Sequence, residues 1–178
     1  GDNGSVPGDE TQPAAVALGE RPVTPPDVIH EEESFYHRIR VSEAGITPNK
    51  RRVLELDSTQ EGGMNPDTGD LILAYQHYWR LAQLNESLTL NRALFLGAGA
   101  FGMPNELSRT FPNAHVDVAE IDPRVIDVGR QFFQLDKHPN VHAHPGDARR
   151  FLLLHDKPDQ RWDLIFGDAY NGIRAIPV

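Results

Sequence analysis

A run of small residues follows an apolar segment in the middle of the chain. Residues 93–96 are apolar, and Gly97, Ala98 and Gly99 come directly after them. Glycine at a strand-to-helix turn lets a phosphate or an adenosyl sulfonium lie against bare backbone, because a Cβ would hold the ligand away. The segment therefore predicts a nucleotide pocket. Small residues at a tight turn can also serve close packing alone, so the pattern depends on its surroundings.

Acidic residues stand where the following strands are expected to end. Glu120 follows a predicted strand over 115–119, and its carboxylate is placed to accept hydrogen bonds from ribose hydroxyls, with Ile121 beside it. A solvated charge at a strand end is the alternative for Glu120. Asp122 precedes Pro123, which favours the interpretation that Asp122 caps a helix rather than binds a ligand.

Two further carboxylates occupy equivalent positions. Asp147, with Ala148 next to it, follows a strand predicted near 141–144; it could accept from an adenine amino group, cap the next helix, or do both. Asp168 follows an apolar strand over 162–167, where burial would raise the pKa of its carboxyl. Such a group suits a general base acting on an amine, and the alternative is a carboxylate that holds the following loop.

Histidines gather in the same half of the chain. A zinc site needs converging ligands in a closed geometry, and this chain has no cysteine to contribute. The spacing of the histidines is ordinary for strands and loops, so we expect no metal site. The histidines concerned are His138, His142, His144 and His155.

Composition narrows the classes of function. The 178 residues carry 17 basic and 26 acidic side chains, a formal charge of -9, without a dense cluster of Lys and Arg, so we expect no nucleic-acid partner. No apolar run approaches the roughly 20 residues that span a bilayer, and the first residues lack the pattern of a signal peptide. We therefore expect no membrane association and a cytoplasmic location.

The elements that must position these residues begin with a tail and a small β module. Residues 1–26 lack apolar periodicity and predict a disordered tail. Residues 27–69 predict the β module, with an antiparallel hairpin between β-prone runs near 35–41 and 52–56 and a glycine-rich loop over 62–69.

Residues 70–178 predict the domain that carries the pocket. It opens with an amphipathic helix, indicated by the spacing of Leu71, Ala74, Tyr75, Tyr78 and Leu81. Strands and helices then alternate with short connections, which predicts a doubly wound parallel sheet. The expected strands span 93–97, 115–119, 141–144 and 162–167, and the helices 104–111, 123–134 and 147–154. Four parallel strands leave an apolar edge, so we expect further chain beyond Val178 or a partner segment to cover it.

Taken in order, these motifs resemble those of the polyamine aminopropyltransferases, the spermidine and spermine synthases, and in particular a spermidine-synthase-like branch of that family. The resemblance runs from about Ser34 to the last residue, and the C-terminal part of the family's chain appears truncated. Each motif is common, but the ordered set is specific. The matching residues are Leu56-Asp57-Ser58-Thr59-Gln60, Tyr75-Gln76, the turn from Gly97 to Gly102, Glu120-Ile121-Asp122, Gly146-Asp147 and Asp168.

The resemblance implies an α/β protein with the Rossmann-like fold of class I S-adenosylmethionine-dependent methyltransferases, with an incomplete parallel sheet after a small antiparallel β module. It implies a homodimer, and decarboxylated S-adenosylmethionine as co-substrate with neither a prosthetic group nor a metal. Gln60 and Gln76 would hold the amino-acid-derived end of this donor, and Glu120 and Asp147 its ribose and adenine. The implied donor-binding residues are Gln60, Gln76, Gly97, Ala98, Gly99, Glu120, Ile121, Asp147 and Ala148.

The resemblance also implies a site for a small amine such as putrescine. Asp168 would take a proton from this acceptor and Tyr75 would orient it, so both are the implied catalytic residues. Tyr170 and Asn171 would line the same site.

At three positions the chain departs from the family pattern. Ala100 and Asn171 stand where the family usually has Asp, and His77 stands where an acid often follows the Tyr-Gln pair. These changes remove negative charge from the expected amine site and favour a less cationic substrate.

Other functions therefore stay open. Ala100 and Asn171 also suit an S-adenosylmethionine-dependent methyltransferase of the same fold, and a noncatalytic adenosyl-binding fragment is a third hypothesis. An NAD dehydrogenase fits the glycine pattern but leaves Asp147, Asp168 and the β module unexplained.

Overall fold

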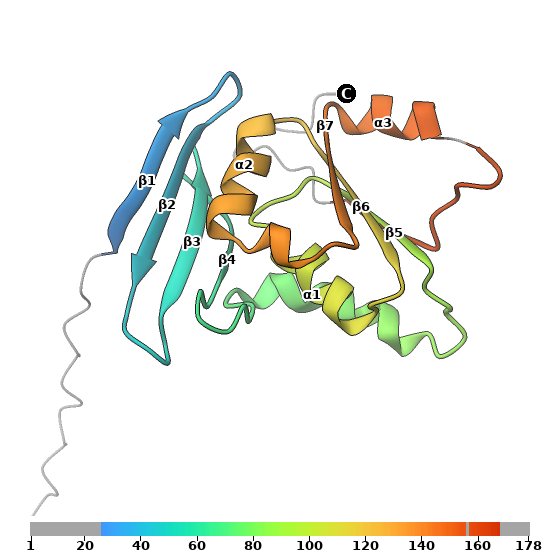
Figure 1. Cartoon of the computed structure of the whole chain (residues 1–178), viewed down its shortest axis with the longest axis horizontal. Coiled ribbons are helices and arrows are strands. Elements are labelled where there is room, and N and C mark those ends of the chain that lie inside the picture. Colours follow the sequence, from blue (N-terminus) through green and yellow to red (C-terminus); the bar gives the residue numbers. More distant parts are fainter. Residues whose placement is uncertain (1–25, 156, 168–178) are drawn as a thin grey trace, which may run out of the picture.

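The chain forms two sheets that lie side by side (Figure 1). The computed structural model describes residues 26–155 and 157–167. The predicted tail, apart from its last residue, lies outside the described residues, and so do Asp168, Tyr170 and Asn171. None of the helices in the described part is long and apolar enough to cross a membrane.

The first sheet is antiparallel and has four strands in chain order. Its second and third strands pair with Val41 opposite Leu54, which confirms the predicted hairpin. A strand on each side enlarges the hairpin to a sheet that the sequence patterns did not indicate. The strands are β1 (Asp27–Glu33), β2 (Arg38–Ala44), β3 (Arg51–Leu56) and β4 (Thr59–Met64).

The glycine-rich loop predicted over 62–69 was wrong at its beginning. Gly62 and Gly63 lie within β4 and pair with Leu54 and Val53 of β3. A Cβ on Gly62 would come within 2.7 Å of the Cβ of Ala100. Glycine is present here because another part of the backbone approaches closely, and in a strand that is its usual meaning.

The predicted amphipathic helix after β4 is present as a 3₁₀-helix, η1 (Ala74–Leu84). Its buried side chains are Gln76 and Trp79, and a spacing of three places them on one face of a helix with three residues per turn. Tyr78 and Leu81 were expected to face inward, but they are 68% and 64% exposed. The spacing of apolar residues thus indicated the wrong face.

The second sheet is parallel, with strand order β7-β6-β5-β8. This confirms the doubly wound α/β prediction, and every strand and helix expected between residues 93 and 167 is present within a few residues. The strands are β5 (Arg92–Leu96), β6 (His115–Glu120), β7 (Val141–Pro145) and β8 (Leu164–Gly167). The helices are α1 (Gly102–Thr110), α2 (Pro123–Phe132), η2 (Leu135–Lys137) and α3 (Ala148–His155).

Helices cover both faces of this sheet because successive strand residues point to opposite sides. Phe95 and Val118 join the main core with α1 and α2. Leu94 and Ala119 face the other way and pack with Phe151 of α3. From β5 the chain adds β6 and β7 on one side, and it then returns to add β8 on the other side of β5. In such sheets ligands bind at the carboxyl ends of the strands, at the point where the strand order reverses.

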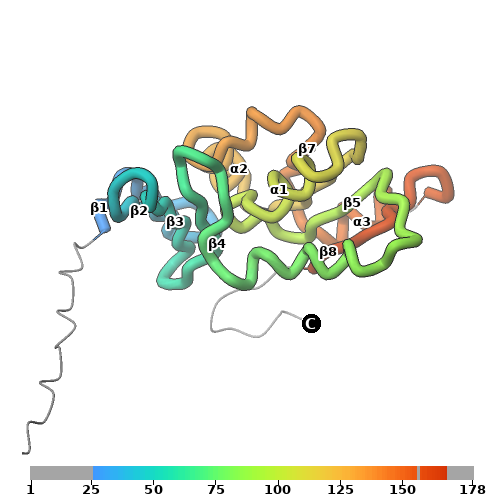
Figure 2. The backbone as a smooth tube through the Cα atoms, turned by 90° about the horizontal axis from the view of Figure 1, so that it is seen from below, coloured from blue at the N-terminus to red at the C-terminus, as the bar shows by residue number. Residues whose placement is uncertain are grey.

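Helix α2 connects the two sheets. Arg52 of β3 donates from Nη1 to the carbonyl oxygen of Phe132, at the end of α2, at 2.6 Å. Ser34, which follows β1, donates from Oγ to the carboxylate of Asp122, which precedes α2. Figure 2 shows the antiparallel sheet beside the α/β part from a second direction.

Candidate functional site

The turn between β5 and α1 is closed by backbone hydrogen bonds. Gly97 donates to the carbonyl of Ala119 at 2.8 Å, and Phe101 donates to the carbonyl of Ala98 at 2.9 Å. Gly99 has a φ of +49°, and a Cβ there would lie 2.4 Å from the carbonyl oxygen of Glu61. Close packing against β4 therefore requires glycine at position 99, whatever ligand the turn binds.

Glu120 holds this turn to the end of β6. Its side chain is buried, and its two carboxylate oxygens accept from the amides of Ala98 and Asp122, each at 2.9 Å. Burial raises the pKa of Glu120, and the hydrogen bonds from Asp122 and Ala98 offset this only in part. The alternative of a solvated charge was wrong. Each oxygen keeps a lone pair that can accept a ligand hydroxyl.

Two of the predicted helix caps are confirmed. Asp122 accepts from the amide of Arg124 at 2.9 Å, and Asp147 accepts from the amide of Arg150 at 2.8 Å. Gly146 donates to the carbonyl of Glu120 at 2.8 Å, which holds the end of β7 beside the end of β6. Asp147, which is exposed, thus stands next to the candidate site, and its contact with adenine stays a prediction.

Two glutamines approach the turn from outside the parallel sheet. Gln76 of η1 is 2% exposed, and its Nε2 lies where a Cβ on Gly102 would approach to 2.5 Å. Gln60 lies on β4, next to Glu61, whose carbonyl oxygen faces Gly99. Gln76 thus lies against the start of α1, whereas Gln60, which is exposed, lies on the strand that packs on the turn. Their contacts with a donor stay predictions.

The position of η1 is fixed by a buried polar contact with α1. Trp79 donates from Nε1 to a carboxylate oxygen of Glu106, and Arg80 pairs with the other oxygen of the same carboxylate. Trp79 and Gln76 share one face of η1, so this contact also holds Gln76 against the start of α1. Tyr75 precedes Gln76 and is partly buried.

One residue near the site was missed in the sequence. His37 lies between β1 and β2, and its Nδ1 is 3.1 Å from a carboxylate oxygen of Asp57. The other oxygen of Asp57 accepts from the amide of Arg38 at 3.1 Å. His37 is close enough to Glu120 for its charge to lower the pKa of that carboxyl slightly. No pattern could have indicated His37, because it precedes Glu120 by more than eighty residues.

Ala100 is the point where the turn departs from the family pattern. Its side chain is 2% exposed, and its Cβ lies against the backbone of Gly62. A short apolar side chain thus fills the contact between β4 and the turn, where the family usually has a carboxylate.

Two histidines, His144 from the predicted group and His115, contact a different carboxylate. Asp117 contacts Nε2 of His144 at 2.8 Å and Nε2 of His115 at 3.0 Å, and it accepts from Arg92 at 2.9 Å and from Trp162 at 2.8 Å. Burial alone would raise the pKa of Asp117, but these hydrogen bonds hold it well below its usual range. The cluster joins β5, β6, β7 and the segment before β8, so its role is structural.

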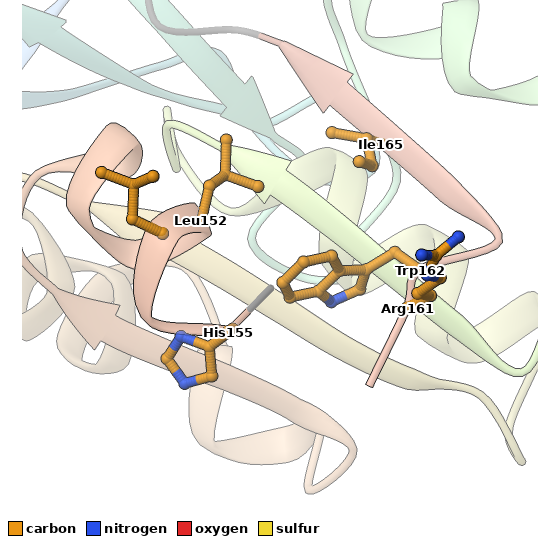
Figure 3. A pocket seen from close by; sticks show the side chains of 6 residues that line it. Leu152, His155, Arg161, Trp162 and Ile165 are labelled. Atoms are coloured by element: carbon orange, nitrogen blue, oxygen red, sulfur yellow. The ribbon is translucent and has the colours of Figure 1, made fainter. Parts of the chain in front are cut away.

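A pocket of about 350 Å³ opens between α3 and β8 (Figure 3). Leu152 and His155 come from α3, and Trp162 and Ile165 lie opposite them in the figure. None of the predicted site residues in the described part lines this pocket. It is therefore separate from the candidate site.

Comparisons with known proteins agree with the family resemblance that the motifs predicted. No family model matches the chain. A curated polyamine aminopropyltransferase from Vibrio vulnificus (strain CMCP6) is 29% identical over 151 residues, which is 82% of this chain and 49% of the relative. The chain thus spans about half the length of this relative. The predicted resemblance to polyamine aminopropyltransferases is confirmed.

Solved structures agree on the fold. A probable spermidine synthase from Corynebacterium glutamicum ATCC 13032 gives a TM-score of 0.69 at 20% identity, over 83% of this chain and 54% of that one. A spermidine synthase in complex with the transition state analogue AdoDATO gives 0.59 at 17% identity, over 80% of this chain and 47% of that one. The chain has the Rossmann-like fold of these proteins, with an antiparallel module before it.

Proposed function

We propose that this protein is an aminopropyltransferase of the spermidine synthase type, which moves an aminopropyl group from decarboxylated S-adenosylmethionine to an amine such as putrescine. The observation that carries the proposal is the placement of Gln76 and Glu120 at the turn from Gly97 to Gly102, with Gln60 on the strand that packs on this turn. Three separate elements supply these side chains. Similarity to curated polyamine aminopropyltransferases supports the same function.

The described residues can bind each part of the donor. The carboxylate of Glu120 accepts from the ribose hydroxyls, and Asp147 accepts from the adenine amino group. Ile121 is 41% exposed and offers an apolar side chain beside the adenine. Backbone at Gly97, Ala98, Gly99 and Ala148 completes the wall around the adenosyl group. The side-chain amides of Gln60 and Gln76 accept from the ammonium of the aminopropyl group.

Transfer is a displacement at the carbon next to the sulfonium. The amine nitrogen forms the new bond to this carbon as the carbon–sulfur bond breaks, and the sulfur leaves as a neutral thioether. The attacking nitrogen then loses a proton to Asp168, while Tyr75, Tyr170 and Asn171 orient the amine. Positioning of the two reactants and exclusion of water supply most of the rate enhancement, with modest assistance from the base.

Two measurements test the proposal. Calorimetry compares binding of decarboxylated and carboxylated S-adenosylmethionine, and mass spectrometry follows aminopropyl product from the decarboxylated donor and putrescine. We expect preference for the decarboxylated donor, and product formation that is slower in Glu120→Gln because this variant binds the donor more weakly. Glu86→Gln makes the same substitution at an exposed position and is the matched control. It should keep the wild-type donor affinity and the wild-type rate of product formation.

Two results would contradict the proposal. Preference for the carboxylated donor would favour a methyltransferase, and tight donor binding without any aminopropyl product would favour a noncatalytic protein. The homodimer and the cytoplasmic location are not needed for either measurement and stay predictions.

A further inference from the structure

A second hollow lies at the opposite edge of the parallel sheet from the candidate site. Its volume is about 510 Å³, and its wall consists of the loop after β4, the last turn of α1 and the segment around η2. Helix α1 begins at the turn after β5 and runs away from it, so its last turn lies at the amino-terminal edge of the strands. No predicted donor-binding residue of the described part lines this hollow.

Three groups that can carry positive charge line this hollow: Arg109, Lys137 and His138. Within the described residues, neither Arg109 nor Lys137 makes an ion pair, and the nearby carboxylate of Asp136 pairs with Arg130 instead. Burial lowers the pKa of His138, and the charges of Arg109 and Lys137 lower it further. In a chain with a net charge of -9, this hollow thus has three groups that can carry positive charge along its wall.

The inner wall of the hollow carries a polar atom that has no partner. Asn105 is 4% exposed, and its Nδ2 donates to the carbonyl of Phe133 at 2.9 Å. Its Oδ1 is buried and accepts no hydrogen bond from any described residue. A buried acceptor without a donor destabilises a fold, so such an atom in a pocket wall points to a ligand that donates to it.

The contact with Ser108 determines which ring nitrogen of neutral His138 carries the proton. The hydroxyl of Ser108 donates to the carbonyl of Asn105 at 2.8 Å, so at its 3.0 Å contact with His138 it must accept from Nδ1. Protonation of His138 therefore occurs at Nε2 and creates a further cationic donor. Gln134, also in the wall, donates to the carbonyl of Pro66 at 2.9 Å and holds the loop after β4 in place.

We propose that this hollow binds a phosphate monoester that also carries hydroxyl groups. The phosphate lies among Arg109, Lys137 and His138, and its double negative charge matches the two permanent cations. A hydroxyl of the ligand donates to Oδ1 of Asn105, directly or through one water. The site is independent of the candidate donor site, and occupancy stabilises the contact between the loop after β4 and the parallel domain.

Nuclear magnetic resonance of the histidine side chains tests this site. The pKa of His138 is measured at constant ionic strength in chloride, with added inorganic phosphate, sulfate or glycerol 3-phosphate, and the His138→Gln variant identifies the signal. We expect glycerol 3-phosphate to raise the pKa of His138 and to bind more tightly than phosphate or sulfate, because only its glycerol part carries alcohol hydroxyls away from the phosphate group.

Variants separate a specific site from general screening. Arg109→Gln removes one permanent cation and should weaken binding of glycerol 3-phosphate about ten-fold or more. Arg149→Gln removes an exposed arginine of α3 and is the matched control. An unchanged pKa of His138, equal effects of the three anions, or equal losses in the two variants would each overturn the proposal.

Discussion

At the scale of single residues, Glu120 combines a structural and a proposed binding role. It is 7% exposed, and two backbone amides already donate to its carboxylate. Burial nevertheless raises its pKa, so the protonated form competes with the ionised form at mildly acidic pH. Since the folded-state pKa is the higher one, ionisation of Glu120 lowers the free energy of unfolding as pH rises through that pKa.

This gives the pH dependence of donor binding. The ionised carboxylate is a stronger hydrogen-bond acceptor than the protonated carboxyl and attracts the sulfonium, so donor affinity should rise as pH increases through the raised pKa of Glu120. Titration calorimetry over a pH range that starts near the ordinary glutamate value of about 4.3 and extends to about pH 8 measures this dependence. In Glu120→Gln, affinity should fall about ten-fold and lose most of this dependence. If donor affinity in Glu120→Gln kept the wild-type pH dependence, ionisation of Glu120 could not be the cause of that dependence.

A second prediction at this scale concerns Asp117. Removal of the charge in Asp117→Asn leaves Arg92 and the two histidines without their shared carboxylate, which should lower the free energy of unfolding at pH 7 by about 3 kcal/mol. Because the folded-state pKa is lowered, this contribution is present above the unfolded value and is lost only below about pH 4.

Urea unfolding at several pH values measures the contribution of Asp117. Asp127→Asn, at an exposed carboxylate of α2 that pairs with two arginines, is the control and should change stability by less than about 1 kcal/mol. Equal effects of the two variants would contradict a special role for the Asp117 cluster.

At the scale of elements, the contact of β4 with the glycine turn decides the geometry of the site. The carbonyl of Glu61 lies over Gly99, and Gly62 lies over Ala100. This contact occupies the space that side chains at positions 62 and 99 would fill. The turn is therefore shaped by the antiparallel sheet as well as by its own strand and helix.

Gly99→Ala tests this contact. Its Cβ would lie 2.4 Å from the carbonyl oxygen of Glu61, and its φ of +49° disfavours a side chain. We expect a loss of about 2 kcal/mol or more in the free energy of unfolding, together with weaker donor binding. Gly167→Ala is the control, since no atom of the described residues lies within 4 Å of its added Cβ. Wild-type stability in Gly99→Ala would show that β4 does not pack on the turn.

At the scale of the whole molecule, polar contacts through α2 set how the two sheets meet. Arg124 of α2 pairs with Glu32 of β1 at 2.6 Å, and Asp122 accepts from both Ser34 and the amide of Arg124. The cap of α2 is thus also the anchor of the antiparallel sheet. His37 is held by the same anchor, because its amide donates to Oγ of Ser34 at 2.8 Å.

Ser34→Ala should therefore affect both stability and the site. Loss of the hydroxyl removes the contact with Asp122 and one acceptor for the amide of His37, and we expect about 1 kcal/mol of destabilisation. Donor affinity should fall as well, since His37 lies near Glu120. Chemical unfolding and calorimetry measure the two effects. Ser87→Ala, whose hydroxyl contacts only the nearby Asn85, is the control and should change neither.

Local patterns in the sequence determined the parallel sheet, its helices and their caps. Apolar runs such as 93–96 predicted strands, and Asp122 and Asp147 predicted helix starts, because burial of a strand and capping of a helix depend on neighbouring residues. The same patterns placed Glu120 at a strand end, where the structure finds it. Motif order predicted the resemblance that the comparisons confirmed.

Only the tertiary structure decided which distant residues meet. Phe101 adopts a φ of +58°, a conformation that favours glycine, and its ring fills the space beside Gly129. The inward face of η1, the closure of β4 over the turn and the place of His37 near Glu120 likewise depend on contacts between separate elements. Such contacts leave no periodic trace in the sequence, because the energy of packing depends on the partner's shape and not on neighbours along the chain.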